Sequence, residues 1–558
     1  MKKILTVVAM LALTGLSAVA QSWVWERTNT DEYHTYGNSA TTDIDGNIYV
    51  TGGFYGGHIN FGNIILYNAD SLTNSDADMY IVKYDPSGNP LWARSAGGTV
   101  NEFGSDIGNS IVTDGHGNVY VTGKFRSLHM IFGHDTLTNT AQYLFDYFIV
   151  KYDANGTVQW AQKAGGTDED AGLAMAVDPS GNIYVTGTFK STFITFGTYT
   201  FASYSAPYDD IFLVKYAPSG TVLFARHYGS NGTEGASGLA IDSDYNIYLS
   251  GSFDSPTLTF GSYILTRGAS SLYDMFVTKT DSAGNVLWAK NAGVGMYNSG
   301  TSLCVDNAKN VYVTGYYRGA TIIFGNDTLT NTHANNDEIF VVKYKYNGVE
   351  LWAKTAGGIS DDEGNSITTD GDNVYLTGSS ASAAITFGSV TLNNYASHDI
   401  FVTEYDGSGN TLFAKGVRGF AWDVGNAITL DANHNIYIAG SYMSDTLAFD
   451  TDTLFGAIYY TMFLAKLSPL TTDIPNVISH NGTTIYPNPS NGSITIESDI
   501  TNYTMVVRDI AGRIVFTKTV VNSLGRETLS LPLTTGIYCY EIVSPQGIHA
   551  NGKIAIIN

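Results

Sequence analysis

Two kinds of short apolar run alternate along most of the chain. One has the form NIYVTG, as in Asn47 to Gly52, and the other the form FIVKY, as in Phe148 to Tyr152. Both are rich in β-branched and aromatic residues, and they are apolar at successive positions, which predicts strands in sheets that are covered on both faces. Turns rich in Gly, Asn and Asp separate the runs and favour tight hairpins.

These runs belong to a repeat. The last glycine of the NIYVTG-like string recurs seven times, at Gly52, Gly123, Gly187, Gly251, Gly315, Gly378 and Gly440, with spacings of 62 to 71 residues. Each unit also has an Asp about nine residues before this glycine, an aromatic residue followed mostly by Gly, and a strand such as LWA. The pattern predicts four principal strands per unit and a small extra ribbon around the aromatic-Gly element.

The phase of the repeat predicts how the array ends. The last unit stops after Thr461 to Leu467 without an LWA strand, whereas Ser22 to Arg27 form an isolated strand of that kind, in which Trp25 aligns with Trp92. We therefore expect the first strand to complete the last unit, and an all-β fold with a closed seven-bladed β-propeller over residues 21–467. The alternative is a linear solenoid, which needs atypical capping repeats.

The D-x-x-G-N-[IV]-Y-V-T-G core resembles the SBBP β-propeller repeat, which occurs in many exported bacterial proteins. The resemblance implies a fold and no particular activity. Residues 1–20 have the features of a signal peptide: Lys2 and Lys3, an apolar stretch from Ile4 to Leu16, and the small-residue site Ala18-Val19-Ala20. No later stretch is long and apolar enough to span a membrane once the signal is removed.

The C-terminal part differs from the repeats. After a linker at 468–482, residues 483–558 read as short strands that predict a small Ig-like β-sandwich. The pieces YPNPSNG, RDIAGRIV, TGIYCYEI and GKIAII resemble the type A C-terminal sorting domain of type IX secretion; a generic Ig-like module is the alternative. The resemblance implies that the outer-membrane export machinery recognises this domain, and that the protein is secreted or held on the cell surface.

The amino-acid composition limits the classes of molecule that the protein can bind. The 558 residues include 38 tyrosines and 60 glycines but only 14% charged residues, and the formal net charge is −23. This acidity argues against a nucleic-acid partner, because phosphate binding needs clustered Lys and Arg. We expect Cys304 and Cys539 to be free thiols rather than a disulfide between domains.

Catalytic and metal-binding motifs are missing from the sequence. It has no CxxC pair, HExxH, P-loop or GxSxG. The DIDGN string from Asp43 resembles the start of an EF-hand loop, but Phe54 stands where the bidentate Glu belongs. Since Asp and Asn recur in every unit, a turn-forming role is the better interpretation.

One set of acids is a candidate cation or ligand site. In five units a carboxylate lies two residues before a Gly or its equivalent, just ahead of the first strand, with Asn298 in the fifth unit. These loops should meet at one mouth of the channel, and oxygen ligands there suit Ca²⁺. The alternative is that each carboxylate caps backbone N–H groups of its own unit. The five acids are Asp106, Asp170, Glu234, Asp362 and Asp423.

These features favour a secreted or cell-surface binding or adhesion protein, with a glycan or protein ligand and no evident catalysis. The alternative is a polysaccharide-acting hydrolase or lyase with its site at one mouth of the channel; a purely structural surface role is a third possibility. An enzymatic site needs residues that break the repeat. The most irregular segments are Thr99 to Asp106, Tyr67 to Asp78 and Arg418 to Asp423.

Overall fold

The computed structural model describes most of the chain as strands and turns. The described residues are 21–29, 33–69, 76–98, 104–395, 397–450, 452–456, 459–469, 483–486, 490, 492–498, 500–508, 513–521, 525–533, 536–544 and 547–556. The expected signal peptide and residues 470–482 of the expected linker lie outside them. Two compact units result: one is Ser22–Pro469, and the other includes Leu470–Asn558. The described residues form no helix, and so none that could cross a membrane.

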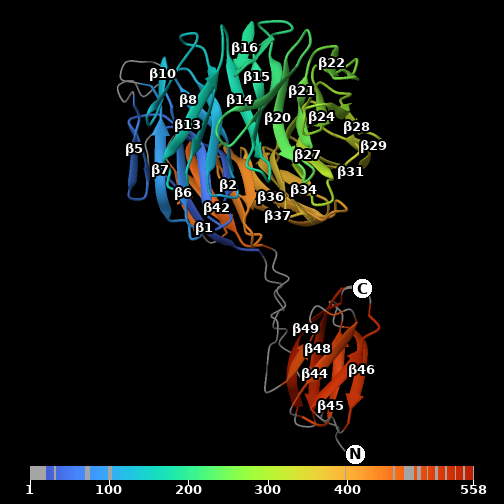
Figure 1. Ribbon diagram of the computed structural model, residues 1–558. Coiled ribbons are helices and arrows are strands. Elements are labelled where there is room, and N and C mark those ends of the chain that lie inside the picture. The colour runs from blue at the N-terminus through green and yellow to red at the C-terminus, as the bar shows by residue number, and fades with distance from the viewer. Residues whose placement is uncertain are drawn as a thin grey trace, which may run out of the picture. The chain divides into compact units, whose positions relative to one another are not determined.

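The larger unit is built from repeated antiparallel sheets, as expected. Its described residues form seven four-stranded sheets, which we number 1 to 7 in chain order (Figure 1). Sheet 1 has the order β2 (Thr35–Thr42), β3 (Ile48–Phe54), β6 (Asp78–Tyr84) and β7 (Pro90–Ala96). All seven residues of β3 and of β6 are buried, which confirms that the middle strands are covered on both faces.

Sheets 2 to 6 repeat this order. Sheet 2 contains β8 (Asp106–Thr113), β9 (Val119–Phe125), β12 (Asp146–Tyr152) and β13 (Val158–Ala164), and sheet 3 contains β14 (Asp170–Val177), β15 (Ile183–Phe189), β18 (Asp210–Tyr216) and β19 (Val222–Tyr228). Sheet 4 contains β20 (Glu234–Ile241), β21 (Ile247–Phe253), β24 (Asp274–Thr280) and β25 (Val286–Ala292), and sheet 5 contains β26 (Tyr297–Val305), β27 (Val311–Arg318), β30 (Asp337–Tyr344) and β31 (Glu350–Ala356). Sheet 6 contains β32 (Asp362–Thr369), β33 (Val374–Ser380), β36 (Asp399–Tyr405) and β37 (Thr411–Val417).

Sheet 7 joins the two ends of this unit. It contains β38 (Asp423–Leu430), β39 (Ile436–Tyr442) and β42 (Thr461–Leu467), and its fourth strand is β1 (Trp23–Thr28). β1 runs antiparallel to β42, with Thr28 opposite Phe463 and Trp25 opposite Lys466 (Figure 1). The prediction that the first strand completes the last unit is therefore confirmed.

The expected extra ribbons are also present. Each is a two-stranded hairpin between the second and third strands of its sheet. The ribbons are β4 (His58–Phe61) with β5 (Ile64–Tyr67), β10 (His129–Phe132) with β11 (Asp135–Thr138), β16 (Phe193–Phe196) with β17 (Tyr199–Ala202), β22 (Thr257–Phe260) with β23 (Tyr263–Thr266), β28 (Thr321–Phe324) with β29 (Asp327–Thr330), β34 (Ala384–Phe387) with β35 (Val390–Asn393), and β40 (Thr446–Phe449) with β41 (Asp452–Phe455).

Hydrophobic cores lie between consecutive sheets. The first strand of each sheet packs against the first strand of the next, and β38 of sheet 7 packs against β2 of sheet 1. One core contains Val50 and Tyr80 of sheet 1 together with Tyr437 and Leu464 of sheet 7. Sheet 7 thus contacts sheet 1 as the other sheets contact their successors.

The recurring motif residues have structural roles. In every unit the Tyr of the NIYVTG-like string donates its hydroxyl to the Asp of the preceding turn, as Tyr49 does to Asp43 at 3.1 Å. The backbone N–H of Asn47 also donates to Asp43, at 2.8 Å, and Lys83 lies 3.3 Å from the same carboxylate. The turn-forming interpretation of DIDGN is confirmed.

The closing glycine is required by close packing. The first strand has a bulge opposite it, and a Cβ on Gly187 would lie 1.9 Å from the carbonyl oxygen of Ala171. Any side chain there would force the two strands apart.

The C-terminal unit contains two sheets. One has the order β43 (Thr484–Tyr486), β44 (Ser493–Glu497) and β47 (Arg526–Ser530); the other has the order β46 (Ile514–Val520), β45 (Tyr503–Arg508), β48 (Gly536–Ser544) and β49 (Gly547–Ile556). Side chains of both, among them Ile494 and Met505, form one hydrophobic core. Cys304 is buried, Cys539 is half-buried, and both are free thiols, as expected.

Candidate functional site

The five predicted acids occupy equivalent positions at one end of the sheets. Each is the first residue of its sheet's first strand: β8, β14, β20, β32 and β38. Neighbouring first strands pack together, so the acids share one end of the unit, as expected. Their side chains, however, are only 0–1% exposed, which places them inside the packed sheets and not on an open channel mouth.

Serine hydroxyls donate hydrogen bonds to these buried carboxylates. Ser191 donates its hydroxyl to Asp170 at 2.6 Å, and the backbone N–H of Gly166 donates to the same carboxylate at 3.0 Å. The same serine contact recurs for Asp106, Asp362 and Asp423, through Ser127, Ser382 and Ser444 at 2.6–2.7 Å. The alternative weighed from the sequence, local capping, is therefore the arrangement found around these carboxylates.

The serines vary together with the acids among the repeats. A serine follows the acid by 20 or 21 residues in the five units that have one: Ser127, Ser191, Ser255, Ser382 and Ser444. In the two other units the position of the acid holds Asn298 or Thr35, and the position of the serine holds Gly319 or Gly56, respectively. Acid and serine thus form one structural pair. Ca²⁺ binding by the acids stays a prediction, and the described residues contain no group of three His, Cys, Asp or Glu placed to hold a metal ion.

A second buried acid lies near each of several capped carboxylates. Asp146 begins β12 near Asp170, and Asp210 begins β18 near Glu234. Desolvation, with a smaller contribution from the neighbouring acid, raises the pKa of Asp170 and of Glu234 to about 7. Oδ1 of Asp146, Oδ1 of Asp210 and Oε1 of Glu234 are buried without a hydrogen-bond partner.

A different set of positions lies at this end, most of them at least partly exposed, and the sequence analysis missed it as a set. We define the rim as three positions per sheet: the residue before the first strand, the residue after the second strand and the residue before the third strand; in sheet 5 the strands extend to include them. In chain order the rim residues are His34, Tyr55, Ala77, Ser105, Arg126, Phe145, Glu169, Lys190, Asp209, Thr233, Asp254, Tyr273, Tyr297, Arg318, Asp337, Asp361, Ala381, His398, Trp422, Met443 and Tyr460.

Backbone hydrogen bonds hold the rim positions together. The N–H of Lys190 donates to the carbonyl of Glu169 at 2.9 Å, and the N–H of Met443 donates to that of Trp422 at 3.1 Å. The first residue of the first strand, which follows a rim residue, bonds to the preceding sheet. For example, the N–H of Asp170 donates to the carbonyl of Phe145 at 2.7 Å. The rim is therefore a fixed surface formed by neighbouring sheets.

The residue types at the rim positions differ from unit to unit, unlike those at the positions that the fold requires. The recurring Asp or Glu lies directly beside a rim position, and the closing Gly lies three residues before another, whereas the rim positions themselves hold every class of side chain. This contrast between adjacent positions was present in the sequence and could have identified the surface.

One half of the rim is charged. Lys190 lies 3.4 Å from Glu169 and 3.9 Å from Asp209. Arg318 donates to both oxygens of Asp337, at 2.9 and 2.6 Å, and to Asp361 at 3.2 Å. Beside this cluster, desolvation and the neighbouring acids Asp337 and Asp361 raise the pKa of Glu363.

Another part of the rim is mostly aromatic. We define the aromatic arc as the six consecutive rim residues His398, Trp422, Met443, Tyr460, His34 and Tyr55, from sheet 6 through sheet 7 to sheet 1. His398 stacks on Trp422 with ring centroids 3.7 Å apart, and His34 lies 5.7 Å from Tyr460 and 6.1 Å from Tyr55. The irregular segment Arg418 to Asp423 belongs here, whereas residues 99–103 and 70–75 of the other two irregular segments, with Glu102, lie outside the described residues.

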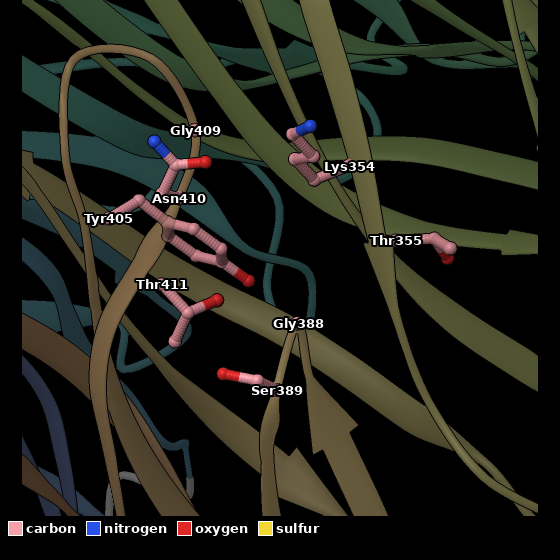
Figure 2. Close-up of a pocket in the computed structure, with 8 residues that line it drawn as sticks. All are labelled: Lys354, Thr355, Gly388, Ser389, Tyr405, Gly409, Asn410 and Thr411. Atoms are coloured by element: carbon pink, nitrogen blue, oxygen red, sulfur yellow. The ribbon is translucent and has the colours of Figure 1, made fainter.

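Cavities occur elsewhere and recur with the repeat. One of about 280 Å³ is lined by Lys354, by Tyr405 at the end of β36, and by Gly409 and Thr411 (Figure 2). Another of about 290 Å³ is lined by the corresponding residues of sheets 1 and 2, including Arg94, Tyr152 and Gly156. Since both arise from the same junction of neighbouring sheets, they are features of the repeat and not a unique site.

Two family models match the chain. The secretion system C-terminal sorting domain matches residues 484–557, and the β-propeller repeat matches residues 93–124, from β7 of sheet 1 to β9 of sheet 2. The chain thus carries SBBP-type β-propeller repeats and a type IX secretion sorting domain. A domain of this kind is recognised by the type IX secretion machinery, and the protein is secreted or attached to the cell surface.

Curated relatives are distant. An uncharacterized WD repeat-containing protein of Acanthamoeba polyphaga mimivirus is 26% identical over 441 residues, covering 64% of this chain and 32% of that protein. A regulatory protein, FlaEY, of Caulobacter vibrioides is 33% identical over 117 residues, covering 21% of this chain and 12% of that protein. The chain spans about a third of the length of the first relative and less of the second.

Solved structures are more distant still. Sqt1 of Chaetomium thermophilum aligns with a TM-score of 0.34 and 9% identity, over 79% of this chain and 99% of that one. An apocarotenoid oxygenase of Synechocystis aligns with a TM-score of 0.34 and 11% identity, over 80% of this chain and 94% of that one. Likeness at this level carries no conclusion about this chain.

Proposed function

We propose that the protein is a secreted or surface-attached binding protein in which the seven sheets form a closed seven-bladed β-propeller and the rim is its ligand-binding surface. The pairing of β1 with β42 and the packing of sheet 7 on sheet 1 support the closed ring. The tail is proposed to be an Ig-like sandwich that serves export, because its two sheets share one core. Binding is then the task of the propeller.

The contrast between uniform and varied positions carries this proposal. Positions that the fold requires are nearly the same in all seven units, whereas the rim differs at almost every step around the unit. Variation of this kind on a rigid scaffold is typical of a surface that contacts a partner, because binding residues sit on loops that the scaffold positions.

Binding by the purified full chain to immobilised glycans and extracellular proteins tests the proposal. We expect retention on at least one ligand class, and loss of retention when Arg318→Ala, Asp361→Ala and Trp422→Ala are combined. The matched control changes exposed residues in turns at the opposite end of the sheets, Ile44→Ala with Tyr346→Ala. Absence of binding, or binding that only the control variant abolishes, would contradict the proposal.

One observation favours an enzyme as a second candidate. The carboxyl of Glu363 has a raised pKa and lies near Tyr316, so it can act as a proton donor to a polysaccharide. Of the acids near Glu363, Asp337 and Asp361 are engaged by Arg318, and Asp362 is buried and bonded to Ser382, which argues against a two-acid mechanism. Release of sugar ends from a polysaccharide, abolished by Glu363→Gln, would favour the enzyme over the binding protein.

A further inference from the structure

The aromatic arc contains two groups of packed rings, one around Trp422 and the other around Tyr460, and it is partly exposed. Trp422 is 45% exposed, and next to it Phe420 and Tyr395 are 69% and 60% exposed and stack on each other at 5.6 Å. At the other end of the arc, Tyr36 packs beside Tyr460 at 5.4 Å. Rings within each group contact one another, so their orientation is fixed before a ligand arrives, which lowers the entropic cost of binding.

The arc carries no charge at neutral pH. Desolvation lowers the pKa of His34 and of His398, so both imidazoles are neutral, and it raises the pKa of Tyr36 to about 12. None of the six arc residues is an acid, Lys or Arg. The arc therefore gains nothing from a ligand's charge, and the overall charge of −23 opposes a polyanion.

The arc combines flat apolar faces with polar edges. Tyr hydroxyls, imidazole nitrogens and the Trp N–H lie at the margins of the rings, and the arc contains no aliphatic branched residue. A pyranose ring has the complementary arrangement, with C–H groups on its face and hydroxyls around its edge.

We propose that the aromatic arc binds a neutral polysaccharide, whose sugar rings stack on Trp422 and its neighbours in sheets 6, 7 and 1. This inference rests on the proposed binding function and specifies its ligand. The length of the arc, over three sheets, suits several consecutive sugars of a polymer better than a single one.

Native affinity electrophoresis of the full chain in gels that contain a polysaccharide tests this. We expect retardation by at least one of laminarin, galactomannan and hydroxyethylcellulose, and none by anionic alginate. Trp422→Ala should weaken the retarding interaction about tenfold, as loss of one stacking contact predicts. Phe420→Ala should weaken it as well, and because Phe420 is largely exposed this variant keeps the fold. Phe193→Ala is the matched control, since Phe193 is 58% exposed on the ribbon strand β16 of sheet 3, outside the aromatic arc.

Each outcome separates this inference from the proposed function. Retardation by a neutral polymer that both arc variants weaken and the control does not supports the inference. Retardation only by alginate, no retardation at all, or retardation that the arc variants leave unchanged would overturn it. The wider proposal survives such a failure if the combined rim variant still abolishes retention on an immobilised protein, and falls only if no rim substitution affects any binding.

Discussion

The indole N–H of Trp25 donates a hydrogen bond of 3.2 Å to the backbone carbonyl of Pro86, 61 residues further along the chain. Trp25 belongs to sheet 7 and Pro86 to the hairpin between the third and fourth strands of sheet 1. Trp92 makes the same bond to Ala154 between sheets 1 and 2, and Trp352 makes it to Gly407 between sheets 5 and 6. The junction between the two ends of the repeat array is thus built like the others.

Removing Trp25 should destabilise the whole repeat unit. We expect Trp25→Ala to lower the free energy of unfolding by about 3–5 kcal/mol, because it removes a buried ring from the core between sheets 7 and 1. Denaturant unfolding followed by fluorescence measures this. Val24→Ala is the control, since Val24 is 51% exposed on the same strand. Equal stability of the two variants would show that this junction does not support the fold.

The buried acid and its serine should behave as one unit. Ser191→Ala should lower the free energy of unfolding by about 1–3 kcal/mol, because a buried carboxyl loses its hydroxyl donor. Asp170→Asn combined with Ser191→Gly recreates the pair found at Asn298 and Gly319, and should cost less than the sum of its single changes. A double-mutant cycle measures the difference, and strictly additive effects would contradict the pairing.

Stability should fall as the pH rises from about 4 to about 7. Desolvation raises the pKa of Asp170 and Glu234 to about 7 and that of Asp423 to about 6 in the folded protein. Through this window the unfolded chain releases these protons while the folded chain keeps them, so the free energy of unfolding decreases as the pH rises.

The turn aspartates act in the opposite direction at lower pH. Asparagine and backbone hydrogen bonds lower the pKa of Asp43 and of Asp242 despite their desolvation, so their contribution is lost as these groups are protonated. Denaturant unfolding from pH 3 to pH 8 should therefore show a maximum near pH 4–5, and Asp170→Asn should flatten the alkaline side. A stability that rises steadily from pH 4 to pH 7 would exclude the buried protons.

Export should depend on the C-terminal unit. Deleting residues 483–558, which include the match to the sorting domain at 484–557, should remove the protein from the cell surface and the medium and leave it within the cell envelope. Fractionation followed by immunoblotting measures this, with the full chain as the reference. Continued delivery of the truncated protein to the surface would mean that another segment directs export.

The architecture was largely predictable because the same pattern of residues recurs in seven units. A Tyr, an Asp and a Gly at constant spacing recur only if each unit forms the same hairpin, and the unpaired LWA-like strand at Trp25 indicated which sheet it completes. The short strands expected in the tail are present as β43 to β49.

The site was harder to predict because burial is a property of packing. Asp170 and its counterparts looked like a ring open to solvent, since a sequence does not show that a loop will fold over them. The matching serines, such as Ser191, carried that information at constant spacing. The aromatic arc was missed because its members come from six separate loop or strand-end positions, which only the packing of the sheets brings together.

The placement of β1 has a consequence for synthesis and refolding. Until the segment up to Leu467 is complete, Trp23–Thr28 has no strand to pair with, and afterwards β42 presents an open edge until that segment arrives. An open edge accepts the same segment from another copy as readily as from its own chain. Refolding at high concentration should therefore give strand-exchanged oligomers, and dilution should give monomers.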